Sequence, residues 1–221
     1  MTQKVDLSAF HPPEKIGAKP LPVYVSKEGD KPLVILHELP GMSPSFIDYC
    51  NRMACERFKV YMPLMYEEPG TEMGKIASLA YCTTRTFRDL FAPDTSNARP
   101  FTAWLMELLQ KISDDHPNTK IGAIGMCLTG GFVISAIAKP QVAAEAACHP
   151  TAPFFFKIHT LGLSDAERES IIAGKEGKAI PCVKAYRYER DILCRETHMN
   201  AAKQLLRTSL DRSLIFLERG I

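Results

Sequence analysis

Residues 125–131 read Gly-Met-Cys-Leu-Thr-Gly-Gly, and this stretch is the most informative part of the sequence. An apolar run at 121–124 precedes it, and the small or apolar residues 132–138 follow it. A nucleophile on a sharp strand-to-helix turn needs this pattern, because flanking glycines relieve backbone crowding and the helix offers its amide groups to a developing negative charge. The pattern therefore predicts that Cys127 is a nucleophile in an α/β protein. The alternative is a buried cysteine in a glycine-rich turn that binds phosphate.

The composition of the 221-residue chain is that of a globular protein with a sizeable core. A formal net charge of +2 predicts neither nucleic acid nor an anionic membrane surface as a partner. No apolar run approaches the roughly 20 residues that span a bilayer, and residues 1–6 lack the apolar segment of a signal peptide. Seven cysteines without a Cys-x-x-Cys pair predict free thiols and a cytoplasmic location.

Strand and helix patterns alternate along the chain, which predicts one domain over 1–221 with a doubly wound, mostly parallel sheet and helices on both faces. Residues 1–20 are expected to form an irregular lead-in, and residues 21–25 an edge strand. The other expected strands are 33–36, 59–62, 120–124, 141–148, 179–186 and 213–217. The expected helices are 46–57, 74–90, one that starts at 100, 165–173 with a capping box of Ser164 and Glu167, and 196–206.

Functional residues of such sheets lie in loops at the carboxyl ends of strands. The loop at 37–41 begins with His and Glu directly after a buried strand, and the Leu39 amide is suitably placed for half of an oxyanion hole. The loop at 187–191 ends in Asp191, where an α/β-hydrolase keeps the acid that orients its histidine. The alternatives are a solvated turn for the first loop and a helix-capping role for Asp191.

Three features together resemble the dienelactone hydrolase family: His-Glu-x-Pro-Gly at 37–41, Gly-x-Cys-Leu-x-Gly-Gly at 125–131, and the downstream Asp191. The similarity extends over roughly residues 20–217. Members of this family are small α/β-hydrolases with a Cys-His-Asp triad. The resemblance implies an α/β-hydrolase fold, a small-molecule ester or lactone as substrate, and hydrolysis with no metal or organic cofactor.

The resemblance also implies a role for each matching residue. Cys127 would be the nucleophile and Asp191 the acid of the triad. Glu38 would contact the thiol and help to control its ionisation. The backbone amides of Leu39 and Leu128 would form the oxyanion hole.

An arginine of the family binds the substrate carboxylate and pairs with the glutamate. Arg85 matches it by position, and Arg88, one helical turn further on, is the alternative.

The chain departs from the family pattern at Thr129, which stands where the turn usually has its first downstream glycine. A side chain there is expected to crowd the crossing of helix and strand, with Gly130 and Gly131 absorbing the strain.

A second departure concerns the general base. The family places its histidine in a loop after the last strand, whereas this sequence has no histidine after His198. Substitutes are His149, at the carboxyl end of its strand, and His159, which follows an aromatic run. Because a thiol near its reference pKa of about 8.5 needs activation, the expected turnover is weak or absent.

Two explanations of the missing loop are open. The chain is either a shortened form of a longer protein, or it is complete and Cys127 works with Glu38 alone or hydrolyses nothing. The alternative function is a non-catalytic hydrolase-fold protein that binds a small acid or a protein partner. A redox-sensing thiol, with Cys148 as the resolving partner of Cys127, is a third reading.

Overall fold

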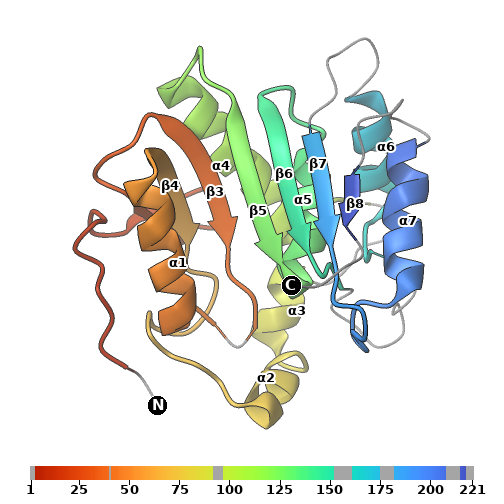
Figure 1. Ribbon diagram of the computed structural model, residues 1–221, viewed down its shortest axis with the longest axis horizontal. Coiled ribbons are helices and arrows are strands. Elements are labelled where there is room, and N and C mark those ends of the chain that lie inside the picture. Colours follow the sequence, from red (N-terminus) through yellow and green to blue (C-terminus); the bar gives the residue numbers. More distant parts are fainter. Residues whose placement is uncertain are drawn as a thin grey trace.

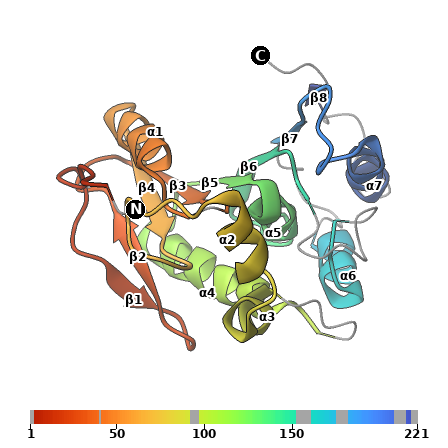
Figure 2. The ribbon, with the colours of Figure 1, turned by 90° about the horizontal axis from the view of Figure 1, so that it is seen from below.

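The computed structural model describes residues 3–39, 41–91, 97–151, 161–174, 182–207 and 215–217. These residues form an eight-stranded sheet in the order β1-β2-β4-β3-β5-β6-β7-β8. Figure 1 shows β3 to β8, and Figure 2 shows β1 and β2. β1 and β2 run antiparallel to their neighbours and the other pairs are parallel, which confirms the predicted doubly wound, mostly parallel sheet. The strands are β1 (Glu14–Ile16), β2 (Leu21–Val25), β3 (Lys31–Leu36), β4 (Phe58–Pro63), β5 (Ile121–Met126), β6 (Val142–Cys148), β7 (Cys182–Tyr186) and β8 (Ile215–Leu217).

Helices cover both faces of the sheet. Figure 2 shows α1 on one face and α4 and α5 on the other. Within the described part of the chain, no helix is long and apolar enough to cross a membrane. The helices are α1 (Pro44–Cys55), α2 (Lys75–Tyr81), α3 (Arg85–Phe91), α4 (Pro100–Asp115), the short 3₁₀ helix η1 (Cys127–Thr129), α5 (Gly130–Ala136), α6 (Asp165–Ala173) and α7 (Glu196–Arg207).

The central strands are buried because helices pack on both of their faces. Val34, Ile35 and Leu36 of β3 are each fully buried, as expected for a continuous apolar run in the middle of a parallel sheet. Their side chains alternate between the core under α4 and α5 and the core under α1. Because β3 to β8 run parallel to one another, their carboxyl ends, marked by the arrowheads in Figure 1, lie at one edge of the sheet.

Three sequence predictions about the first half of the chain were wrong in part. The irregular lead-in at 1–20 contains β1, which pairs with β2, so residues 21–25 form a strand that is not at the edge. The helical segment predicted over 74–90 is interrupted at residues 82–84, and it forms two helices, α2 and α3. Thr83 and Thr84 lie at that break, and the Thr84 hydroxyl accepts from the Phe87 amide at the start of α3.

The capping box predicted at the start of α6 is confirmed, and it belongs to a larger buried network. The Ser164 hydroxyl accepts from the Glu167 amide, and Glu167 accepts in return from the Ser164 amide at 2.7 Å. Glu167 also accepts from Arg99 Nε at 3.0 Å and from the Thr102 hydroxyl. The Arg99 guanidinium lies 3.8 Å above the ring of Phe132, so the network joins α4, α5 and α6.

We expect Glu167→Ala to lower the free energy of unfolding by about 3–5 kcal/mol, because it leaves the fully buried Arg99 charge uncompensated. Asp115→Ala is the matched control, since it removes the exposed pair with Lys111 and should cost less than about 1 kcal/mol. Denaturant unfolding of both variants measures the difference. Equal, small losses would show that the buried pair does not stabilise this packing.

Candidate active site

Cys127 lies on the turn between β5 and α5, at the carboxyl end of the sheet. Its φ of +52° is in the left-handed region, which is uncommon for a residue other than glycine and costs on the order of 1–3 kcal/mol. Neighbouring glycines make the turn feasible. A Cβ at Gly125 would come within 2.5 Å of the Thr129 carbonyl oxygen, and a Cβ at Gly130 within 3.0 Å of Pro150.

Thr129 forms hydrogen bonds at this turn, and the crowding expected from its side chain stays a prediction. Its buried hydroxyl accepts from the Met126 amide at 2.8 Å. It also lies 2.8 Å from the Met126 carbonyl oxygen and 3.2 Å from that of Leu36, each of which is an acceptor. The side chain therefore connects the turn at Cys127 to the end of β3, and the glycine that is usual at this position would make no such bond.

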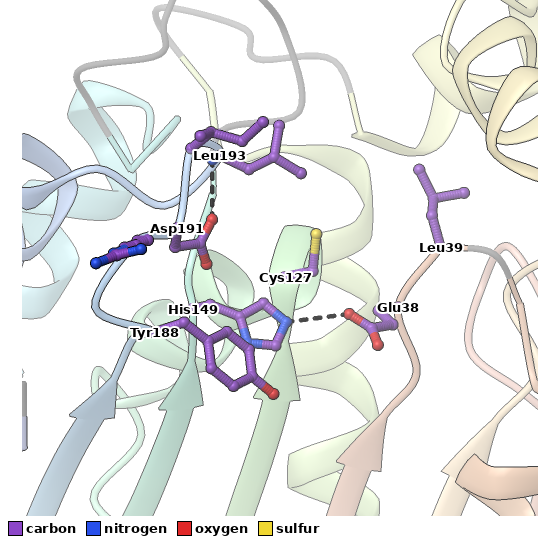
Figure 3. A pocket seen from close by; sticks show the side chains of 9 residues that line it. Glu38, Leu39, Cys127, His149, Tyr188, Asp191 and Leu193 are labelled. Carbon is purple, nitrogen blue, oxygen red and sulfur yellow. Dashed lines mark hydrogen bonds and ion pairs between the residues drawn. The ribbon is translucent and has the colours of Figure 1, made fainter. Parts of the chain in front are cut away.

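A cavity of about 480 Å³ opens beside the Cys127 thiol (Figure 3). The loops after β3, β5, β6 and β7 all contribute to its wall, because their strands end at the same edge of the sheet. The volume is within the range of small-molecule sites, roughly 300–1,000 Å³. The residues that line it are Glu38, Leu39, Cys127, His149, Tyr188, Arg190, Asp191, Ile192 and Leu193.

His149 is held in this cavity from several sides. Its Nε2 lies 3.2 Å from Oε2 of Glu38, as the dashed line in Figure 3 marks. Its ring stacks on Tyr188 with centroids 5.5 Å apart, and its backbone amide donates to the Tyr186 carbonyl at 2.6 Å. The φ of His149 is +37°, a second strained residue beside Cys127. An ionised carboxylate only accepts hydrogen bonds, so Nε2 carries the hydrogen in this contact.

The Cys127 thiol is protonated at neutral pH. Burial raises its pKa above the ordinary value, and the carboxylates of Glu38 and Asp191 raise it further. Hydrogen bonds with the Thr151 hydroxyl, at 3.4 Å, and with the Leu128 amide act in the opposite direction. The thiol therefore needs a group that removes its proton before it can attack.

This raised pKa predicts slow alkylation of Cys127 by iodoacetamide at pH 7. The rate should rise by about tenfold per pH unit while the thiolate fraction remains small. Peptide-resolved mass spectrometry across pH 6 to 10 measures it, with the exposed Cys55 as the reference in the same digest. Fast alkylation that is already independent of pH at pH 7 would contradict a protonated thiol.

His37 fixes the loop that presents Glu38. It is fully buried, its Nε2 accepts from the Met65 amide at 3.1 Å, and its Nδ1 donates to the Glu38 carbonyl at 3.2 Å. Burial lowers the pKa of the imidazole to about 4, so the ring is neutral and keeps this pattern of donor and acceptor. Leu39 follows directly and lines the cavity.

Asp191 lines the cavity, but its recorded hydrogen bonds lie within its own loop. Its Oδ1 accepts from the amides of Leu193 and Cys194, each at 2.9 Å. This arrangement is an Asx turn that shapes the rim of the pocket. The role of Asp191 as the acid of a triad stays a prediction.

The structure does not bring Arg85 to this pocket. Arg85 lies on α3, its side chain is 90% exposed, and its Nε is 3.7 Å from Asp89 one turn on. It is not among the residues that line the cavity, and neither is Arg88. Substrate binding by Arg85 therefore stays a prediction that this geometry does not support. His159 falls outside the described residues.

Sequence reasoning missed Tyr188 and Thr151. Tyr188 is in the loop at 187–191 that was singled out for Asp191, so its proximity could have been inferred from the loop alone. Thr151 is two residues after His149, and its amide donates to the Cys127 carbonyl at 3.1 Å. No sequence pattern indicates that contact. Among the described residues, no three His, Cys, Asp or Glu side chains are arranged to hold a metal ion.

A mostly parallel sheet with a strained strand-to-helix turn at its carboxyl edge is typical of the α/β-hydrolase fold. Residues 22–182 match the dienelactone hydrolase family, and the chain belongs to that family of hydrolases. No curated protein matches it in a sequence comparison.

Solved structures similar to this chain have the same fold at low sequence identity. A candidate dienelactone hydrolase from Klebsiella pneumoniae is 14% identical, with a TM-score of 0.61 over 96% of this chain and 84% of that one. The Pyrococcus furiosus esterase Pf2001 is 12% identical, with a TM-score of 0.65 over 100% and 88%. XC6422 from Xanthomonas campestris, described as an α/β serine hydrolase without a lid, is 12% identical, with a TM-score of 0.54 over 98% and 86%.

Proposed function

We propose that the chain hydrolyses a carboxylic ester or lactone through the thiol of Cys127. One observation carries the proposal: Cys127, on a strained turn, opens into the same cavity as the hydrogen-bonded pair of Glu38 and His149. Strained residues persist where the surrounding structure holds them, and they concentrate at functional sites. A thiol, a carboxylate and an imidazole are also the groups that nucleophilic acyl transfer requires.

The first half of the reaction forms an acyl-enzyme. The proton of Cys127 moves to the pair of Glu38 and His149, and Sγ forms a bond to the carbonyl carbon. The tetrahedral intermediate then collapses, the bond from carbon to the leaving oxygen breaks, and the pair returns the proton to that oxygen. Proton transfer of this kind contributes about 10²–10⁴-fold to a rate.

The second half releases the acid. A water molecule gives a proton to the pair of Glu38 and His149, and its oxygen bonds to the acyl carbon. The bond from carbon to Sγ breaks and the proton returns to Sγ, so that the free thiol and a carboxylic acid remain. In this scheme His149 takes the place of the histidine that the resemblance puts after the last strand.

The negative charge of the tetrahedral intermediate needs donors that are already in position. The Leu128 amide contacts Sγ of Cys127, at the beginning of the helical segment that follows the nucleophile. Leu39 lines the cavity from the end of β3. We assign the oxyanion hole to these two backbone amides, in agreement with the family pattern.

A time course with p-nitrophenyl hexanoate tests this function. The proposal predicts release of many equivalents of p-nitrophenol per chain, at a rate proportional to protein concentration. A single equivalent would mean acylation of the thiol without hydrolysis of the acyl-enzyme. Release no faster than in buffer would contradict hydrolysis and favour a protein that binds a small acid or a protein partner.

A further inference from the structure

Four of the eight other described residues that line the cavity beside the Cys127 thiol are apolar or aromatic. Leu39, Tyr188, Ile192 and Leu193 all line the cavity. Figure 3 shows Leu39 and Leu193 on opposite sides of the Cys127 thiol. Ile192 is 81% exposed and Leu193 is 62% exposed. Large apolar residues that are exposed together at one site usually mark a binding surface.

The charges at this site do not suit an anion. Among the described residues, three charged side chains line the cavity, and two of them are the acids Glu38 and Asp191. The third, Arg190, is exposed to solvent, which screens its attraction for a carboxylate. Arg85, the residue expected to bind a substrate carboxylate, lies on α3 beside Asp89 instead.

We propose that the site selects neutral esters with an apolar chain and disfavours substrates that carry a carboxylate. This inference rests on the proposed function and names its substrate class. The chain of the ester would lie against Leu39, Ile192 and Leu193 and take apolar surface out of water. Each buried methylene should raise kcat/KM by about fourfold. A carboxylate on the substrate would lie near the acids Glu38 and Asp191, and this repulsion would lower kcat/KM.

Two esters of equal chain length test the proposal. They are p-nitrophenyl hexanoate and the p-nitrophenyl half ester of adipic acid, which differ by a terminal carboxylate. We expect kcat/KM to be at least about tenfold higher for the hexanoate, because like charges placed together cost several kcal/mol. Equal values, or a preference for the adipate, would overturn the inference.

Single substitutions test whether the residues that line the cavity, and not other exposed residues, determine the substrate preference. Leu193→Asp should lower kcat/KM for the hexanoate by about tenfold or more, since it places a third acid at the rim. Ile172→Asp is the matched control, because Ile172 is an exposed apolar residue on α6. This substitution should change kcat/KM for neither ester. Arg190→Ala should leave the ratio of kcat/KM for the two esters within about threefold of the wild-type ratio, because solvent screens this cation. A selective loss of adipate turnover would make Arg190 a carboxylate anchor and would contradict the proposal.

A binding measurement keeps this inference separate from hydrolysis. The neutral ketone 2-octanone and the keto acid 7-oxooctanoate are tested for protection of Cys127 against iodoacetamide at pH 9. We expect the neutral ketone to protect at a concentration at least about tenfold lower. This outcome without ester turnover would contradict the proposed function and leave the substrate preference standing. Equal protection, better protection by the keto acid, or no protection by either would overturn the preference.

Discussion

Cys127→Ala should reduce kcat/KM for p-nitrophenyl hexanoate by about 10³-fold or more. The variant removes Sγ, and with it the only route to a covalent intermediate in the proposed mechanism. Losses of this size follow removal of a nucleophile, and the residual rate comes from binding and from the oxyanion hole. Steady-state assays of purified wild-type and variant chains measure the ratio.

Cys55→Ala is the control for this prediction, because Cys55 is an exposed thiol at the end of α1 and outside the cavity. It should leave kcat/KM within about twofold. Far-ultraviolet circular dichroism and denaturant unfolding check that Cys127→Ala still folds. A folded Cys127→Ala variant with most of the wild-type rate would place the chemistry at another residue.

His149→Asn should lower kcat by about 10²–10⁴-fold, the usual contribution of a general acid or base. Asparagine adopts positive φ more readily than most residues, so the variant keeps the backbone at +37°. Its side chain does not exchange a proton with the thiol or with the leaving group. KM should change much less than kcat, because His149 acts on protons and not on the chain of the substrate.

His116→Asn is the matched control. His116 lies at the end of α4, outside the cavity, and forms a hydrogen bond with the Tyr61 hydroxyl. Glu38→Gln should lower kcat by a similar factor to His149→Asn. The double variant should lose little more than either single variant, because two groups that act as one unit are not additive. Full activity of His149→Asn would assign the proton transfer to Glu38 alone or to a group outside the pair.

The nucleophile turn could be predicted from the sequence because its requirements are local. A strand, two flanking glycines and a small-residue helix occupy consecutive positions at 121–138, and β5, η1 and α5 follow that order. The capping box at Ser164 is local in the same sense. The prediction of several parallel strands also placed Glu38 and Cys127 at one edge of the sheet, and both residues line the cavity.

Features that depend on long-range packing were not predictable in this way. The pairing of His149 with Glu38 joins residues on two different loops, and their separation of 3.2 Å depends on the positions of both strands. Similarly, Arg85 matched a family position, but the split into α2 and α3 leaves its side chain in solvent. The buried Arg99 followed no pattern in its own segment, because its partner Glu167 lies on another helix.

The structure gives each part of the proposed site a separate physical basis. Glycine positions and the Thr129 hydroxyl hold the turn that presents Cys127. The buried His37 fixes the loop of Glu38, and Tyr188 supports the ring of His149. These contacts hold the side chains that the proposed mechanism uses at the ends of neighbouring strands.

The most direct test of the central claim is to locate the acyl group during turnover. Wild-type protein is mixed with p-nitrophenyl hexanoate, quenched in acid within the first turnovers, digested and analysed by peptide mass spectrometry. A hexanoyl group should appear on the peptide that contains Cys127 and should disappear as the substrate is exhausted. Turnover with that peptide unmodified throughout, or with a hexanoyl group that forms and decays on another residue, would contradict Cys127 as the nucleophile.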